Sequence, residues 1–316
     1  MLEHVGGIDH CVVLVRDLDK AAETFARAGF TVAPRGVHSA HMGTGNNCVM
    51  LEKDYFEILG VLTPTEANAK WRAVLETREG MTAIAMRAHD AERGAAEVAA
   101  RGIPTMPVMR FGRPVDMPDG SRTETRFNTF HLVDPVAPGL RIFACQHLTP
   151  GATWVPGTMT HANTAKGLTG IEVLAADPAS VATAIAKLLD SAPEHMGDGV
   201  LRVPTSAAPI IVLNRTALAA RYGALDLAGL PDAGPVTLGI TVADLAAAQA
   251  CLTKAGLPFS AIPGGGIAVA PAAAHGVILA FRAGSRFAMP SMQTLQKIVL
   301  VLLVITALAQ VLRALF

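Results

Sequence analysis

The stretch GIDHCVVLV at residues 7–15, followed by DLDKAAETFA at residues 17–26, decides the fold. The first stretch is an apolar run of strand length. The second has apolar residues at helical spacing behind Asp17, a residue type that caps helix N-termini. Three more strands complete the unit, at 30–32, 47–51 and 55–60. The sequence therefore predicts a strand, a helix and three strands in order, a βαβββ unit.

The same pattern can be read three more times along the chain. The later copies begin with strands at 80–86, 170–174 and 236–240, and continue with helices at 90–101, 178–189 and 243–255. The first two copies also end alike, because each is followed by Leu-Thr-Pro, at 62–64 and at 148–150. A chain built from one supersecondary unit folds by stacking its copies. We therefore expect an α+β fold of tandem paired βαβββ modules.

The length of 316 residues suits two domains. Two modules make up residues 1–150, two more make up residues 168–284, and the Pro-, Gly- and Thr-rich residues 151–167 are the predicted linker. The apolar residues 291–316 are predicted to form a C-terminal helix. This helix has two alternative interpretations. One is a membrane anchor, since residues 298–316 would span about 28 Å at ~1.5 Å per residue. The other is a helix buried in a homodimer interface.

Composition narrows the functional classes. A formal net charge of +0 and 5% aromatic residues give no reason to expect nucleic-acid binding. The four cysteines have no Cys-x-x-Cys spacing, so we expect core residues rather than a disulfide or zinc framework. The N-terminus lacks a basic start followed by an apolar core, the mark of a secretory signal. These features indicate a cytoplasmic protein, tethered to the cytoplasmic membrane if the C-terminal helix is an anchor.

The paired units, His10, the loop HMGTGNN at 41–47 and the strand residues YFE at 55–57 resemble the glyoxalase-like domains of the vicinal oxygen chelate superfamily. This superfamily includes glyoxalase I, extradiol dioxygenases and bleomycin-resistance proteins. The resemblance is good over the first half of the chain and only topological in the second. It implies a curved sheet closed around a pocket, with a divalent metal (Fe, Mn, Ni or Zn) held by His and Glu side chains. The fold hosts both metal-dependent enzymes and metal-free binders, so it does not specify a reaction.

Strand alternation predicts which side chains face the pocket. It places His10, Glu57 and His147 on the inner face, and imidazole and carboxylate groups suit these metals. We therefore predict His10, Glu57 and His147 as metal ligands, and Glu57 and His147 as catalytic residues. Superposing the two modules puts Ala83 and Phe143 where the resemblance implies two more ligands. The third ligand thus stays open among three histidines, His147, His41 and His131.

Further residues are candidates for substrate binding. His41 and Asn46 lie in the Gly-rich loop, and His131 lies on a predicted strand at 126–133. Arg113 and Arg126 flank a predicted hairpin turn at Asp119-Gly120. Arginines that converge on the pocket mouth would favour an anionic substrate, whereas the alternative is a solvated hairpin.

The leading hypothesis is a metal-dependent lyase, isomerase or dioxygenase acting on a small oxygen-bearing molecule. The alternative is a metal-free binding or sequestering protein of the bleomycin-resistance type, which Ala83 and Phe143 favour. A third hypothesis is a membrane-tethered module that binds a partner. The second half offers no comparable group of residues, and we expect it to be a degenerate copy.

Overall fold

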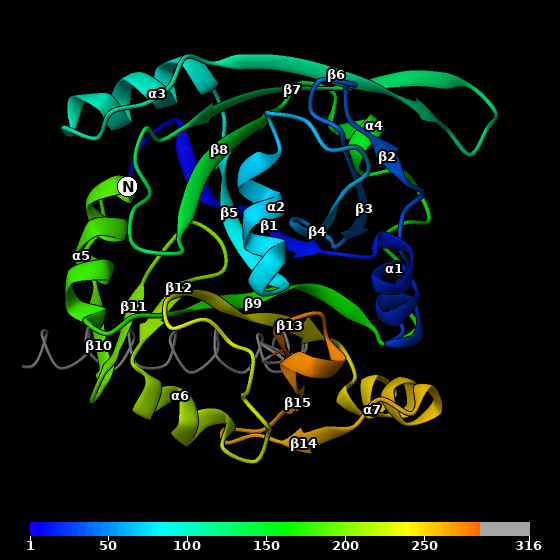
Figure 1. Ribbon diagram of the computed structural model, residues 1–316, viewed down its shortest axis with the longest axis vertical. Helices are drawn as coiled ribbons and strands as arrows, with labels where there is room; N and C mark the ends of the chain where they lie inside the picture. Colours follow the sequence, from blue (N-terminus) through cyan, green and yellow to red (C-terminus); the bar gives the residue numbers. More distant parts are fainter. Residues whose placement is uncertain (285–316) are drawn as a thin grey trace, which may run out of the picture. The chain divides into compact units, whose positions relative to one another are not determined.

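The computed structural model describes residues 1–284, and residues 1–283 form one compact unit. They contain two eight-stranded mixed sheets (Figure 1). The first sheet consists of β1 (Val5–Val15), β2 (Gly36–Val37), β3 (Thr44–Met50), β4 (Tyr55–Val61), β5 (Gly80–Ala88), β6 (Met109–Asp116), β7 (Arg122–His131) and β8 (Arg141–His147). The second consists of β9 (Ala165–Leu174), β10 (Glu194–Gly197), β11 (Val200–Val203), β12 (Ile210–Leu213), β13 (Gly234–Val242), β14 (Phe259–Ala261), β15 (Ile267–Val269) and β16 (Ile278–Ala283).

The two sheets have the same topology. Their strand orders are β2-β3-β4-β1-β5-β8-β7-β6 and β10-β11-β12-β9-β13-β16-β15-β14. In the first sheet, β1 pairs in parallel with β4 and antiparallel with β5, so two modules meet along their first strands. The pairing of β9 with β12 and β13 repeats this arrangement. The predicted fold of tandem paired βαβββ modules is confirmed.

Each module has one crossover helix that begins behind an aspartate. These helices are α1 (Leu18–Arg27), α3 (Ala91–Ala100), α5 (Pro178–Leu189) and α7 (Leu245–Ala255). Their N-caps are Asp17, Asp90, Asp177 and Asp244, and each side chain accepts a hydrogen bond from a backbone N–H of the first turn. An N-cap of this kind satisfies a donor that has no partner within the helix. The repeat in the sequence is therefore also a repeat in local hydrogen bonding.

The predicted strand at 30–32 is wrong, because the second strand of the first module is β2 at Gly36–Val37. Phe30 is instead a core residue, with its ring 5.3 Å from that of Phe56 and 5.8 Å from that of Phe281. An aromatic residue in a short apolar run satisfies the strand pattern equally well when it packs in the core. The predicted turn at Asp119-Gly120 does join β6 to β7, and Gly120 has a φ of +81°.

Three helices lie outside the repeat: α2 (Ala69–Thr77), α4 (Pro150–Thr153) and α6 (Arg215–Tyr222). Figure 1 shows α2 inside the ring made by the strands of the first sheet. Its Trp71, Val74 and Leu75 pack against an apolar cluster that includes Val12 and Leu59. The interior of the first sheet is therefore filled at one end by a connecting helix.

The main core joins the two sheets. One continuous apolar cluster includes Val13 of β1 and Leu238 of β13, and the rings of Phe30 and Phe281 stack across it. Buried polar contacts add to it, since the backbone N–H of Leu168 donates to Asp54 Oδ1 at 3.0 Å. The two halves of the unit therefore share their hydrophobic core.

The second sheet holds a buried carboxylate of its own. Glu172 on β9 accepts hydrogen bonds from Arg221 of α6 at 2.9 Å and from Thr237 of β13 at 2.9 Å. Leu218 and Tyr222 of α6 pack in the apolar cluster beside it. Glu172 is thus fully partnered within the protein, as expected for a structural buried charge.

The predicted linker is partly structured. Residues 151–167 include the end of α4 and the start of β9. Within it, Trp154 Nε1 donates to the backbone oxygen of Leu51 at 3.1 Å, and His161 Nε2 lies 2.8 Å from that of Met50. The predicted helix at 291–316 lies outside the described residues. Within residues 1–284, no helix is both long and apolar enough to cross a membrane.

Candidate functional site

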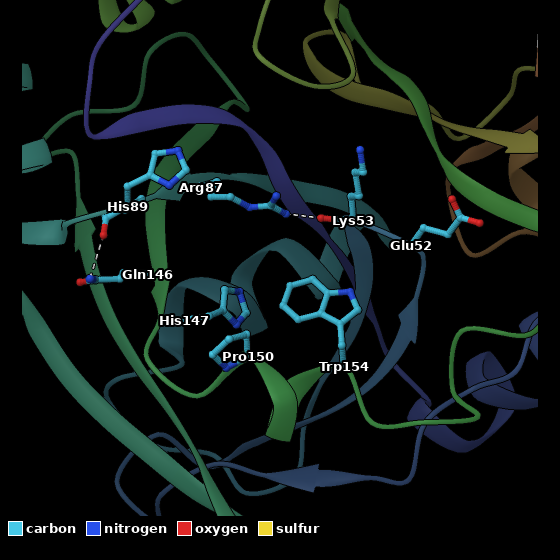
Figure 2. Close-up of a pocket in the computed structure, with 9 residues that line it drawn as sticks. Glu52, Lys53, Arg87, His89, Gln146, His147, Pro150 and Trp154 are labelled. Atoms are coloured by element: carbon cyan, nitrogen blue, oxygen red, sulfur yellow. Dashed lines mark hydrogen bonds between the residues drawn. The ribbon is translucent and has the colours of Figure 1, made fainter. Parts of the chain in front are cut away.

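A cleft of about 390 Å³ opens at one end of the first sheet (Figure 2). Three segments meet there: the turn between β3 and β4, the adjacent ends of β5 and β8, and α4. The lining residues are Glu52, Lys53, Arg87, Ala88, His89, Gln146, His147, Pro150 and Trp154. Since β5 and β8 are paired in parallel, their ends lie at the same edge and bring Arg87 and His147 together.

Asp9 is the hub of the polar network beside this cleft. Its side chain is fully buried, and Oδ2 lies 2.8 Å from His10 Nδ1 and 2.9 Å from His147 Nε2. Its other oxygen, Oδ1, accepts a hydrogen bond from Arg87 Nε at 3.0 Å. Burial alone would raise the pKa of Asp9, but the bonds to His10 and His147 outweigh it and hold the pKa well below its ordinary value. The carboxyl group is therefore ionised at neutral pH.

A local irregularity lets Asp9 and His10 act together. Adjacent residues of a regular strand point to opposite faces. The pairing of β1 with β5 shifts register between Ile8 and His10, as at a β-bulge, and bulges redirect side chains. Alternation alone predicted an inward His10 and gave no reason to select Asp9. The sequence signal that was available is a charged residue in the middle of an apolar strand.

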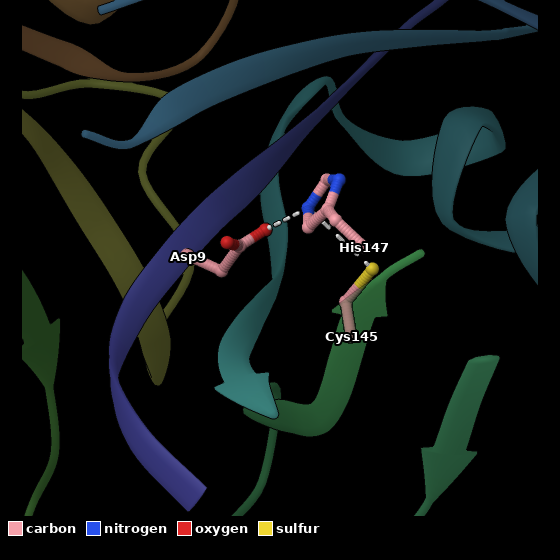
Figure 3. Close-up of side chains that lie close together, drawn as sticks. All are labelled: Asp9, Cys145 and His147. Atoms are coloured by element: carbon pink, nitrogen blue, oxygen red, sulfur yellow. Dashed lines mark hydrogen bonds and ion pairs between the residues drawn. The ribbon is translucent and has the colours of Figure 1, made fainter. Parts of the chain in front are cut away.

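Aromatic rings surround the two histidines. His10 stacks on Tyr55 with a centroid distance of 4.4 Å, and the His147 ring lies 5.1 Å from that of Phe127 and 4.9 Å from that of Trp154. The Sγ atom of Cys145 lies 3.9 Å from His147 Nε2 (Figure 3). Burial raises the pKa of the Cys145 thiol well above its ordinary value, so the thiol is protonated.

Glu57 belongs to a separate polar group. Its Oε1 accepts a hydrogen bond from Asn46 Nδ2 at 2.7 Å and lies 3.9 Å from His38 Nε2. Burial lowers the pKa of His38, while the charge of Glu57 raises it and that of Arg113 lowers it. Three predicted residues therefore belong to this group: Glu57 bonds to Asn46, and the charges of Glu57 and Arg113 both act on His38. The spacing of the loop did not distinguish His38 from His41.

The family model of a glyoxalase-like domain matches residues 8–189 of this chain. The chain belongs to the glyoxalase-like domain family. No curated protein matches it in sequence.

Solved structures with the same fold as this glyoxalase-like protein include two with a TM-score above 0.5. A hypothetical protein from Staphylococcus aureus has a TM-score of 0.59 and 11% identity, over 88% of this chain and 99% of the other. A fusion of a xylose isomerase-like TIM barrel with 4-hydroxyphenylpyruvate dioxygenase has a TM-score of 0.53 and 12% identity. That match covers 93% of the glyoxalase-like chain and 52% of the fusion, about half its length. Such identities show the fold alone.

The glyoxalase-like protein does not gather its three predicted metal ligands into one donor set. His10 and His147 meet through Asp9, whereas Glu57 bonds to Asn46. Within residues 1–284, two groups of three His, Cys, Asp or Glu side chains place their ligand atoms within 4.8 Å of one another: Asp9, Cys145 and His147, and Glu3, His4 and Glu97. The metal that the resemblance implies therefore does not fit His10, Glu57 and His147 as they lie here.

The second module of the first sheet explains part of this mismatch between the implied metal and the predicted ligands. His10 pairs with Tyr55 and Val12 with Glu57, so the two predicted ligands are offset by two residues on β1 and β4. Ala83 pairs with Arg141 and Ala85 with Phe143, which repeats the same offset on β5 and β8. Ala83 and Phe143 therefore occupy the positions that correspond to His10 and Glu57, and neither can bind a metal.

The remaining predicted residues lie apart from the cleft lining. His131 stacks on Phe143 at 4.8 Å, and burial together with Lys70 and Arg141 lowers the pKa of His131 to about 4. His41 is exposed and contacts Ser39 Oγ at 3.0 Å. Arg126 is exposed on β7. The structure brings neither His41 nor Arg126 to the residues around Asp9 or Glu57.

Proposed function

We propose that this glyoxalase-like protein is an enzyme that acts on a small oxygen-bearing anion bound in the cleft, with His147 at the reacting group. One observation carries the proposal: a histidine fixed by a buried carboxylate lies in the lining of a cleft that also presents cationic side chains. Active-site histidines are usually found in such a setting, held by a polar partner within an open cleft.

The charge of the lining favours an anion. Arg87 and Lys53 are the cationic residues of the lining, of which Arg87 is paired with Asp9, and Glu52 is paired with Lys166 at 3.1 Å. Among the described residues, Lys53 has no ion-pair partner, so its ammonium group is available to a ligand. Carboxylate and phosphate groups form charge-assisted hydrogen bonds with such side chains. Trp154 and Pro150 add an apolar wall, which suits the carbon part of a small metabolite-sized molecule.

The proton on His147 can be assigned from its partner. An ionised carboxylate only accepts hydrogen bonds, so His147 Nε2 carries the proton that is donated to Asp9. The other nitrogen, Nδ1, is then an acceptor, and lies 3.4 Å from Thr153 Oγ1. A ligand hydroxyl group that reaches Nδ1 can give up its proton there, the type of step that isomerases and lyases use. Asp9 would stabilise the imidazolium that results.

Replacing Lys53 tests the anion site. We expect Lys53→Met to weaken the binding of oxalate, used as a small dianionic probe, about 10-fold, the effect of losing ~1.5 kcal/mol of charge-assisted hydrogen bonding. Isothermal titration calorimetry of the full chain measures this. Lys20→Met is the matched control, because Lys20 is an exposed residue of α1 whose ammonium lies 3.6 Å from Asp17. An equal loss of oxalate affinity in both variants, or no loss in either, would mean that the anion binds elsewhere.

The second candidate function is metal-free sequestration, which Ala83 and Phe143 favour because they remove two of the ligand positions implied by the resemblance. The His147→Asn variant separates the candidates. An enzyme would keep its affinity for a substrate within a few-fold and lose turnover in a panel of 2-hydroxy and 2-oxo acids. A sequestering protein would bind members of the panel without converting any of them, in the wild type as in the variant.

A further inference from the structure

We infer that Asp9, His147 and Cys145 form a divalent-metal site, with zinc the best-matched ion, displaced by one residue along β1 from His10. The inference goes beyond the proposed function: it keeps the anion in the cleft beside His147 and replaces the proton-accepting role of His147 with that of a metal ligand. It is independent of which molecule the cleft binds.

The three donor atoms converge on one point. Asp9 Oδ2 lies 2.9 Å from His147 Nε2, Cys145 Sγ lies 3.9 Å from the same nitrogen, and all three ligand atoms are within 4.8 Å of one another. A Cys-His-Asp relay would instead place the thiol and the carboxylate on opposite nitrogens of the ring. Figure 3 shows both contacts made to one nitrogen, which is the arrangement of ligands around a shared centre.

The distances suit zinc after a small adjustment. Zinc lies about 2.0–2.2 Å from nitrogen and oxygen ligands and about 2.3 Å from sulfur, in a tetrahedron. These lengths place neighbouring donors about 3.3–3.7 Å apart. The carboxylate would therefore move away from His147 by about half an ångström, and the thiolate toward it by a few tenths. A mixed set of sulfur, nitrogen and oxygen donors is typical of zinc.

The surrounding groups match those of a metal centre. Arg87 Nε bonds to Asp9 Oδ1, and Oδ2, which also lies 2.8 Å from His10 Nδ1, is the oxygen directed at the site. Thr153 Oγ1 faces His147 Nδ1, and metal-bound histidines commonly donate their second N–H to such a partner. His147 also lines the cleft, so one side of the site has access to solvent and ligands. Three protein ligands with an open position are the pattern of catalytic zinc sites.

The charges can also be balanced. Asp9 is already ionised, and its charge is matched by Arg87. The buried Cys145 thiol releases its proton to solvent when a cation binds, since a coordinating thiol is deprotonated by the metal. The imidazole proton of His147 then sits on Nδ1, facing Thr153 Oγ1, so that Nε2 offers its lone pair to the metal. Without a metal, the site therefore has a protonated thiol, and the charge of its carboxylate is balanced by Arg87. With a metal bound, it offers a carboxylate, an imidazole and a thiolate as ligands.

Cobalt substitution tests the assignment without an activity assay. Full-length, tag-free protein is stripped with a chelator, titrated with Co²⁺ and followed by near-ultraviolet and visible absorption. We expect one equivalent of Co²⁺ and a sulfur-to-cobalt charge-transfer band, which Cys145→Ser abolishes. Cys48→Ser should keep the band, because Cys48 is also buried in the first sheet but belongs to neither group of clustered ligand atoms. Glu57→Gln should keep it too, as the control for the positions implied by the resemblance.

A second measurement needs no variant. X-ray absorption spectroscopy of the zinc-loaded wild type should count one sulfur ligand, even if Cys145→Ser fails to fold. Glu97→Gln controls for the second group, Glu3, His4 and Glu97, and should leave the cobalt spectrum unchanged. Absence of bound metal, a spectrum without sulfur ligation, or a charge-transfer band that survives Cys145→Ser would each overturn the site. His147 would then keep the proton-accepting role proposed above.

Discussion

Asp9→Ala is expected to lower the free energy of unfolding by about 3–5 kcal/mol, the range for removing one partner of a buried ion pair. The substitution removes the carboxylate that Arg87, His10 and His147 all contact. His10 and His147 would then lie in the interior without this acceptor, while the half-buried Arg87 would keep its bond to the backbone oxygen of Lys53. A buried donor without a partner is strongly destabilising. Urea denaturation at pH 7, followed by circular dichroism, measures the effect.

Comparing Asp9→Ala with the wild type also tests how the free energy of unfolding depends on pH. The pKa of Asp9 in the folded protein is held below its ordinary value of 3.8. A carboxyl group with a lowered pKa stabilises the fold above its unfolded-state pKa, and this contribution is lost as the pH falls through the folded-state pKa. The difference in free energy of unfolding between the wild type and Asp9→Ala should therefore be constant at neutral pH and become smaller as the pH falls below about 4.

The matched control is Asp17→Ala. Asp17 is an exposed N-cap whose side chain accepts from the backbone N–H of Lys20, and losing an N-cap costs about 1 kcal/mol. An Asp9→Ala variant no less stable than Asp17→Ala at pH 7 would show that the network around Asp9 does not hold the first sheet together.

Phe56→Ala is expected to destabilise the whole of residues 1–283 by about 3–5 kcal/mol. Phe56 on β4 is fully buried, and its ring lies 5.0 Å from that of Phe25 and 5.3 Å from that of Phe30. Phe30 in turn stacks on Phe281 of the second sheet. A large cavity at this position therefore weakens the core that the two sheets share, and thermal unfolding should remain a single transition at a lower temperature.

Phe111→Ala is the control for this substitution, because Phe111 on β6 is 46% exposed and its truncation leaves no closed cavity. Its effect should stay within about 0.5–1 kcal/mol, near that of other surface substitutions. Two separate transitions in Phe56→Ala, with the second sheet still folded, would mean that the two sheets are stable independently of one another.

The repeated modules are what the sequence determined by itself. Periodicity and caps are local signals: the apolar run in residues 7–15 forms β1, and the aspartates at four equivalent positions begin four helices. The resemblance to the glyoxalase-like family rests on residues such as His10 and Glu57 that lie within these modules. Superposing the two modules already placed Ala83 and Phe143 at the positions of two implied ligands, so the sequence also indicated that this ligand set is incomplete.

Only the tertiary structure decided which polar side chains meet. Asp9, Arg87 and His147 are far apart in the chain, and they join because β5 and β8 end at the same edge of the sheet while β1 is irregular between Ile8 and His10. The placement of α2 inside the first sheet was equally out of reach, since a short amphipathic helix carries no information about which surface it covers. Contacts of this kind depend on strand register and packing between distant segments, whereas sequence periodicity reports only the neighbourhood of each residue.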